Sequence, residues 1–244
     1  MSSLRDIHEK VRRVPVVRVS LSAIMTGLVY AFTVVFSLYI PQTRGFFNFG
    51  EIGVYIASLV GGPFVGFVAG GLGSALADVT LGYYHYAPAT FIIKGIEGFI
   101  VGSLSERLEV IKGRTRVYLC CYPGIVAIAA IMYILGTNLY LGTAEVTFAL
   151  GAIYEFTFNE VVWLIVSCIF CIITLYLTFK YLEVAGWILS MAAGGLEMVL
   201  GYFLYEQYIL GFVAIAEVPF NVMQMLIGMF GATIVTHYLR RLRL

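Results

Sequence analysis

Long apolar runs recur along almost the whole of this chain, and they constrain its fold more than any other feature. A helix that crosses the hydrocarbon core of a bilayer needs roughly 20 mainly apolar residues. Hydrophobic residues make up 61% of the sequence and charged residues only 12%, and the runs lack the short alternating segments of a membrane barrel. We therefore predict an all-α integral membrane protein with about eight transmembrane helices. The runs occupy residues 16–40, 51–60, 64–81, 88–105, 117–139, 160–179, 186–208 and 218–238.

The second run is short, because Gly61, Gly62 and Pro63 interrupt it before the third run begins. Proline cannot easily continue a helix, and the interruption separates the two runs. The sequence shows no soluble domain and no low-complexity linker. Residues 1–244 are therefore expected to form a single membrane domain.

Lys and Arg residues are distributed unevenly between the connections. All but two of the 15 lie before or at the start of the first run, between the fourth and fifth, after the sixth or after the last. The exceptions are Arg44, in a connection of the opposite parity, and Lys94, inside the fourth run. Because cytoplasmic loops retain Lys and Arg, the pattern predicts a multi-pass protein of the cell membrane with both termini in the cytoplasm. The basic clusters suit anchoring beside anionic membrane lipid, and the net charge of +1 gives no reason to expect nucleic acid as a partner.

Polar and aromatic residues collect in the connections that are predicted to face outward. Aromatic faces combined with amides and a carboxylate suit a flat heterocyclic ligand that forms hydrogen bonds. An aromatic belt at the membrane interface is the alternative, although a belt does not require the amides. The candidates for ligand contact are Asn48, Glu51, Tyr83, Tyr84, His85, Asn221 and Gln224.

Ionisable side chains inside apolar runs are costly, and they usually mark a site or a satisfied pair. Lys94 and Glu97 are three residues apart and can meet on one helical face. They are expected to form an intramembrane ion pair or to contact a ligand. Together with Asp78 and Glu197 they could instead form the proton or ion relay of a self-sufficient secondary transporter or channel.

Small residues recur every four positions in the first run, at Ala23, Gly27 and Ala31. Their alignment creates a groove that lets another helix approach closely, because lipid provides no hydrophobic driving force between helices. The groove could serve packing within the chain or docking of another membrane subunit.

Motifs for catalysis are absent from the sequence. It contains no His-Glu-x-x-His, no Gly-x-Ser-x-Gly and no Gly-Lys-Ser/Thr nucleotide-binding pattern. The Cys168 and Cys171 pair lacks a second pair of ligands and is interpreted as packing. We therefore expect no catalytic residue, no metal site and no cofactor, and any ATP that drives transport must be hydrolysed by another polypeptide.

Six segments together resemble a known family: FNFGEIG at 47–53, GPFVG at 62–66, GSALAD at 73–78, APATFIIKGIEG at 87–98, GYFLYE at 201–206 and PFNVMQ at 219–224. They are similar to the S component of energy-coupling factor (ECF) vitamin transporters, in particular the riboflavin-type group. The resemblance covers residues 16–110 and 186–240. It implies a six-helix core that captures a vitamin or related micronutrient outside the cell. It also implies docking, through the small residues of the first helix, to a transmembrane T component with two cytoplasmic ATPases.

The chain departs from this family by an extra transmembrane hairpin at residues 117–179, between the fourth and fifth helices of the family pattern. Two added passes preserve the sidedness of everything that follows. The leading hypothesis is thus a non-enzymatic substrate-capture subunit, and the secondary transporter and a structural or assembly protein are the alternatives. Riboflavin, a thiamine precursor and a pyridoxine form all fit an aromatic, amide-lined pocket.

Overall fold

The computed structural model describes residues 3–35, 37–40, 45–108, 114–139, 141–147, 153–181 and 185–241. Within these residues, seven helices are long and apolar enough to cross a membrane. The all-α membrane class is therefore confirmed. The helices are α1 (Ser3–Arg13), α2 (Pro15–Val35), α3 (Gly50–Leu81), α4 (Ala87–Leu108), α5 (Arg114–Leu139), α6 (Glu160–Lys180), α7 (Ala185–Leu210) and α8 (Val218–Arg241), with a short 3-10 helix, η2 (Gly211–Ala216), before α8.

Helix α3 folds back on itself at Gly62, which has φ 76° and ψ −170° and is followed by Pro63. A positive φ is open to glycine at little cost, and proline lacks the N–H that would continue the helix. The two arms then run side by side, since a Cβ placed on Gly66 would meet Ser58 and one placed on Gly70 would meet Val54. Seven long helices thus provide eight apolar segments, in agreement with the number expected from the sequence.

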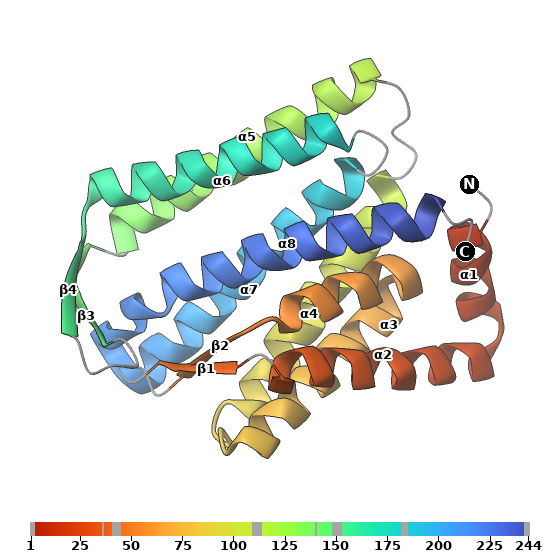
Figure 1. Cartoon of the computed structure of the whole chain (residues 1–244), viewed down its shortest axis with the longest axis horizontal. Coiled ribbons are helices and arrows are strands. Elements are labelled where there is room, and N and C mark those ends of the chain that lie inside the picture. Colours follow the sequence, from red (N-terminus) through yellow and green to blue (C-terminus); the bar gives the residue numbers. More distant parts are fainter. Residues whose placement is uncertain are drawn as a thin grey trace.

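Figure 1 shows three groups of helices: α2, α3 and α4 on one side, α7 and α8 in the middle, and α5 with α6 on the other side. Helix α4 packs on α7, α3 packs on α8, and α5 and α6 pack on each other and on α7. The two arms of α3 with α2, α4, α7 and α8 therefore form a six-segment core, and the α5–α6 hairpin lies against its edge.

Glycines bring the second arm of α3 into direct backbone contact with α4. A Cβ on Gly98 would overlap the carbonyl of Gly66, and one on Gly102 would overlap the backbone at Pro63. Packing and not hydrophobic burial holds helices together in lipid, so small residues are needed where two backbones touch. This contact fixes the position of α4 along α3.

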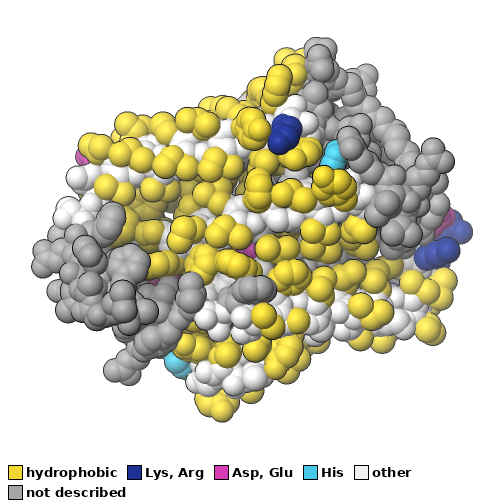
Figure 2. All heavy atoms as spheres, in the orientation of Figure 1, with side chains coloured by type: hydrophobic (Ala, Val, Ile, Leu, Met, Phe, Trp, Pro, Cys, Tyr) yellow, Lys and Arg dark blue, Asp and Glu magenta, His cyan; other side chains and the backbone are white. Residues whose placement is uncertain are grey.

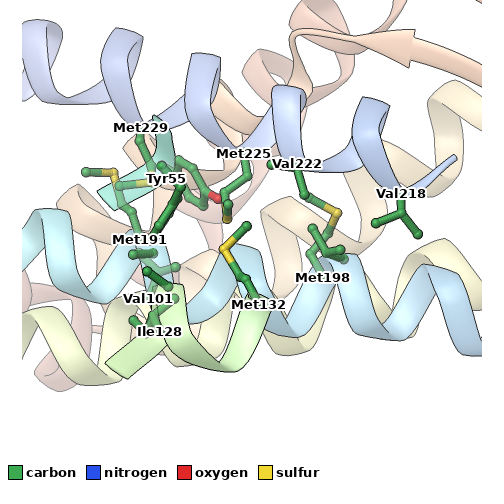
Figure 3. Packing of buried hydrophobic residues seen from close by; sticks show 14 of the residues in the cluster. Tyr55, Val101, Ile128, Met132, Met191, Met198, Val218, Val222, Met225 and Met229 are labelled. Atoms are coloured by element: carbon green, nitrogen blue, oxygen red, sulfur yellow. The ribbon is translucent and has the colours of Figure 1, made fainter. Parts of the chain in front are cut away.

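The core between the helices is rich in methionine. Met191 and Met198 of α7 face Met225 and Met229 of α8, and the buried ring of Tyr55 from α3 lies among them (Figure 3). Methionine is unbranched and flexible, and it fills irregular gaps between elements. The cluster joins the first arm of α3 to both C-terminal helices.

The N-terminal helix α1 was not expected from the sequence. His8 Nε2 lies 3.1 Å from the carbonyl oxygen of Leu59, and Arg12 forms an ion pair with Glu106 near the end of α4. These contacts join α1 to the bend of α3 and to α4. Both termini lie at this end of the molecule (Figure 1).

Two short antiparallel β-hairpins are present where the sequence was expected to form only helix or loop. They are β1 (Ser37–Ile40) with β2 (Gly45–Asn48), and β3 (Gly142–Thr147) with β4 (Ile153–Phe158). The first apolar run was expected to remain helical to residue 40, but α2 ends at Val35 and residues 37–40 pair with β2. β-branched and aromatic residues suit strands as well as apolar helices, so hydropathy alone did not distinguish them. Both hairpins lie at the end opposite the termini (Figure 1).

The outer surface of the helices is broadly apolar, as Figure 2 shows for one face. Large exposed hydrophobic side chains include Ile24 on α2, Ile92 on α4, Ile172 on α6 and Leu204 on α7. Such a continuous apolar surface is expected where helices face lipid. The Lys and Arg side chains visible on this face lie in its right half, toward the termini (Figure 2).

The glycine contact between α3 and α4 generates a direct test of this packing. Gly98→Ala places a Cβ against the Gly66 carbonyl, and overpacking of this kind typically lowers the free energy of unfolding by about 1–3 kcal/mol. Gly27→Ala is the matched control, because nothing lies within 4 Å of a Cβ at that position, and alanine favours a helix over glycine by about 1 kcal/mol. Unfolding in detergent, followed by circular dichroism, should show Gly98→Ala melting below the wild-type protein and Gly27→Ala at or above it. Equal melting of the two variants would contradict the contact.

Candidate functional site

A polar pocket lies at the end of the core opposite both termini, where α2, β2, α3, α4, α7 and α8 meet. Its empty volume is about 490 Å³, a figure that includes the opening to solvent. The lining residues are Thr33, Phe46, Asn48, Ser74, Asp78, Tyr86, Thr90, Lys94, Tyr202, Glu206, Glu217, Asn221 and Gln224.

The fold explains why residues far apart in sequence meet here. The bend at Gly62 returns the second arm of α3 to the level of its start, so that Asp78 lies near Asn48. The short helix η2 reverses the chain between α7 and α8, which brings Glu206 and Asn221 to the same end.

A chain of hydrogen bonds holds the amide side chains of the pocket in place. Gln224 Nε2 donates to Asn221 Oδ1 at 3.1 Å, and Gln224 Oε1 accepts from the backbone N–H of Asn48 at 3.0 Å. Asn48 Oδ1 in turn accepts from the N–H of Gly50 at 2.8 Å, at the start of α3. The Nδ2 donor of Asn221 is buried and has no hydrogen-bond partner within the described parts of the chain. It is therefore available to a ligand.

Lys94 extends from the pocket into the core of the protein. Its Nζ forms an ion pair with Glu51 from the first arm of α3 and lies 3.2 Å from Glu97 Oε2, one turn along α4. It also lies 5.6 Å from the ring centre of Tyr202, a distance suited to a cation–π contact. Burying an ion is costly unless an opposite charge accompanies it, so the lysine stabilises both carboxylates and they stabilise it.

Three further carboxylates line the pocket, at Asp78, Glu206 and Glu217. Asp78 and Glu206 are only 4% and 3% exposed. Burial raises the pKa of the Tyr86 phenol above its ordinary value, and the neighbouring Glu206 and Glu217 carboxylates raise it further. The Tyr86 hydroxyl thus remains protonated. The Tyr202 hydroxyl on the other side donates to Thr90 Oγ1 at 3.1 Å.

Three of the ligand contacts proposed from the sequence, Asn48, Asn221 and Gln224, lie together in this lining. Glu51 is not among the lining residues, but it is buried next to them through its pair with Lys94. Its position favours an indirect role, in which it orients the lysine.

The outer loop residues proposed as contacts lie outside the lining. The Tyr83 ring stacks on Phe46, which does line the pocket, with ring centres 4.6 Å apart. Tyr84 is 68% exposed. His85 is also exposed, and its carbonyl oxygen accepts a hydrogen bond from the Tyr205 hydroxyl. These residues surround the opening of the pocket without forming its walls.

Several lining residues were not proposed as contacts from the sequence. Among them, Thr33, Ser74 and Thr90 are polar residues within apolar segments. Such residues are unremarkable singly, and Thr33 satisfies its own hydroxyl by donating to the Val29 carbonyl at 2.8 Å. The available signal was their common depth in the membrane, which becomes evident only when the helices are placed side by side.

Ala23, Gly27 and Ala31 are all exposed on α2. The groove that they form is therefore not filled by another helix within the part of the chain that the structure describes. Its use as a docking surface remains a prediction.

The buried charges at Lys94 give a second test. Lys94→Met should leave Glu51 and Glu97 buried without their cation and lower the free energy of unfolding by about 3–5 kcal/mol, as removal of one partner from a buried pair typically does. The matched control is the triple variant Lys94→Met/Glu51→Gln/Glu97→Gln, which removes all three charges and should recover most of the loss. Thermal unfolding in detergent compares the two. A triple variant no more stable than Lys94→Met would show that charge pairing is not what stabilises this region.

Comparison with known proteins places the chain in a family. The family model described as "ECF-type riboflavin transporter, S component" matches residues 14–162. A curated protein of Pyrococcus woesei, described only as an uncharacterized protein in a gap 3' region, is 42% identical over 124 residues, which are 50% of this chain and 75% of the relative. No solved structure matches the chain.

The matched range contains α2, α3, α4 and α5 and ends at the start of α6, so it includes Asn48 and Lys94 but not α7 or α8. It does not itself distinguish which helices are additional to the family core, and the assignment of residues 117–179 as an inserted hairpin stays a prediction. The family consists of transport subunits and not of enzymes. Because the match covers more than half of the sequence, this chain belongs to the family of ECF-type riboflavin transporter S components.

Proposed function

We propose that this protein is the substrate-capture subunit of an ATP-driven ECF importer and that it binds a vitamin or related micronutrient in the pocket between α3, α4, α7 and α8. The observation that carries the proposal is the chain of oriented amides at Asn48, Gln224 and Asn221 in a pocket with aromatic walls. Few, well-placed polar groups among aromatic faces are typical of sites for small heterocyclic ligands.

The distribution of charge supports an outward-facing pocket. Arg12, Arg13 and Arg18 lie on α1 and α2 near the termini, and Arg107 lies near the end of α4 that contacts α1. Basic residues are retained on the cytoplasmic side, so the termini would be cytoplasmic and the pocket extracellular. A ligand could then enter from outside without crossing the bilayer.

Each part of the site has a role in this proposal. Phe46, Tyr86 and Tyr202 provide faces for stacking, and Asn221 Nδ2 donates a hydrogen bond that fixes the orientation of the ligand. The outer residues Tyr83, Tyr84 and His85 would contact the ligand by closing over it. Glu51 acts through Lys94.

Transport would require the other subunits of an ECF system, namely a T component and two ATPases. The exposed groove at Ala23, Gly27 and Ala31 is the proposed docking surface for the T component. Small side chains would let a partner helix approach the α2 backbone closely. Energy from ATP hydrolysis would reach the capture subunit through this contact.

The alternative of a self-sufficient transporter depends on the buried ionisable residues. Lys94 is already paired with Glu51 and Glu97, which favours a structural role over a mobile relay. Uptake measured in a host that lacks every ECF energising subunit separates the two functions. Uptake driven by an ion gradient in such cells would favour the self-sufficient transporter.

The binding proposal predicts the effect of removing two amides. Asn221→Ala/Gln224→Ala should weaken binding roughly tenfold to a hundredfold, because each buried hydrogen bond to a ligand contributes on the order of 1 kcal/mol and the partners left behind are unpaired. Titration calorimetry with riboflavin, thiamine and pyridoxine as probes measures the change. Gln207→Ala, on an exposed position of α7, is the control. Unchanged affinity in a correctly folded double variant would refute the assignment.

The docking proposal predicts that a larger side chain on α2 prevents assembly with the T component but leaves ligand binding unchanged. Ala31→Leu should abolish co-purification with a co-expressed T component and its ATPases, while the binding of small-molecule probes is retained. Ala130→Leu introduces the same change at an exposed position of α5 and should leave assembly intact. Normal assembly of Ala31→Leu, or loss of assembly in both variants, would contradict docking through α2.

A further inference from the structure

Acidic side chains outnumber basic ones among the described lining residues of the pocket. Asp78, Glu206 and Glu217 line it, and Lys94 is the one Lys or Arg among the described lining residues. The charge of that lysine is already engaged by Glu51 and Glu97. Asp78 and Glu206 therefore have no basic partner within the described segments.

Buried polar atoms in the lining indicate where a ligand would be recognised. Asp78 Oδ2 and Glu206 Oε2 are buried acceptors without a hydrogen-bond partner in the described segments, and Asn221 Nδ2 is a buried donor in the same condition. Leaving such groups unpaired is unfavourable, and more so when they are charged. A ligand that offers positive charge to the two carboxylates and an acceptor to the amide would satisfy all three.

Aromatic rings accompany the carboxylates. Tyr86 lies close enough to Glu206, Glu217 and Asp78 for all three carboxylates to influence its hydroxyl group, and Phe46 and Tyr202 complete the aromatic part of the lining. The face of an aromatic ring attracts a cation, most strongly where water is excluded. Carboxylates and aromatic faces are the two groups that recognise an organic cation.

A metal ion fits this arrangement poorly. Across the described residues, no three His, Cys, Asp or Glu side chains are grouped so that they could hold one metal ion. Carboxylates spread around a pocket of about 490 Å³ suit a charge that is delocalised over a larger molecule.

We propose that the ligand of this S component is an organic cation, a protonated amine or a positively charged heterocycle, whose charge lies between Asp78 and Glu206 and whose acceptor group receives the Asn221 amide. This inference rests on the proposed function and specifies the class of its substrate. Selectivity over neutral heterocycles of similar shape would come from the two carboxylates, while the amides and rings recognise shape.

Matched pairs of probes test the inference at pH 7.5 by titration calorimetry on the purified full chain. The pairs are pyridoxamine with pyridoxine, 1-methylnicotinamide with nicotinamide, and thiamine with riboflavin, the cation being named first in each. In at least one pair the cation should bind ten or more times as tightly as its neutral counterpart. Asp78→Asn and Glu206→Gln should each reduce that affinity roughly tenfold to a hundredfold, and the exposed Glu160→Gln should not.

Melting temperatures of the ligand-free variants separate recognition from folding. Since Asp78→Asn and Glu206→Gln replace a buried carboxyl group that has an unpartnered oxygen atom with a neutral amide of similar shape, neither should melt below the wild-type protein. A loss of affinity in both variants that is accompanied by lower melting temperatures would overturn the inference in favour of a structural role. Neutral probes that bind as tightly as the cations, with affinity insensitive to both variants, would also overturn it while the capture function stands. If no probe of either charge binds, both the inference and the capture function fail.

Discussion

The direct contact between the backbones of α3 and α4 is the constraint on which the rest of this structure depends. Gly66 and Gly98 allow the backbones of the two helices to touch. Such close packing is needed because hydrophobic burial does not drive helix association in lipid. The contact sets the height of α4, and that height determines which residues Lys94 can reach. Had either glycine carried a side chain, the lysine would be displaced from Glu51 on the opposite arm of α3.

Two polar regions with different requirements follow from this placement. Around Lys94 the charges are paired internally, so this region contributes to the fold whether or not a ligand is present. Toward the opening, Asp78, Glu206 and Asn221 retain unsatisfied polar atoms. A binding protein commonly has lower stability where its ligand is recognised, because the ligand provides the missing interactions. Lys94 lies between the two regions, because it lines the pocket and is also paired with Glu51 and Glu97.

Sequence patterns predicted the parts of this fold that depend on local properties. The apolar runs, the break at Gly62 and Pro63, and the three amides now seen in the lining were all identifiable from residue type and spacing. The strand pairing of residues 37–40 with β2 was not, because the same residues suit an apolar helix. Nor were Thr33 and Thr90 recognised as lining residues, since their role depends on the depth at which α2 and α4 pack. The residue type of Tyr84 suggested a ligand contact; its side chain is mostly exposed, and the contact stays a prediction.

The bend at Gly62 has an electrical consequence. The first arm of α3, Gly50–Gly61, has about 12 residues and rises only about 18 Å, whereas the hydrocarbon core is roughly 30 Å thick. The arm starts beside Asn48, and with the shortfall at that end the floor of the pocket would lie on the order of 10 Å within the bilayer, part of the way down the transmembrane voltage drop. Moving one elementary charge through the whole drop changes its energy by about 2.3 kcal/mol per 100 mV. A positively charged ligand held at this depth would therefore bind more tightly as the cell interior becomes more negative, and a neutral ligand would not respond.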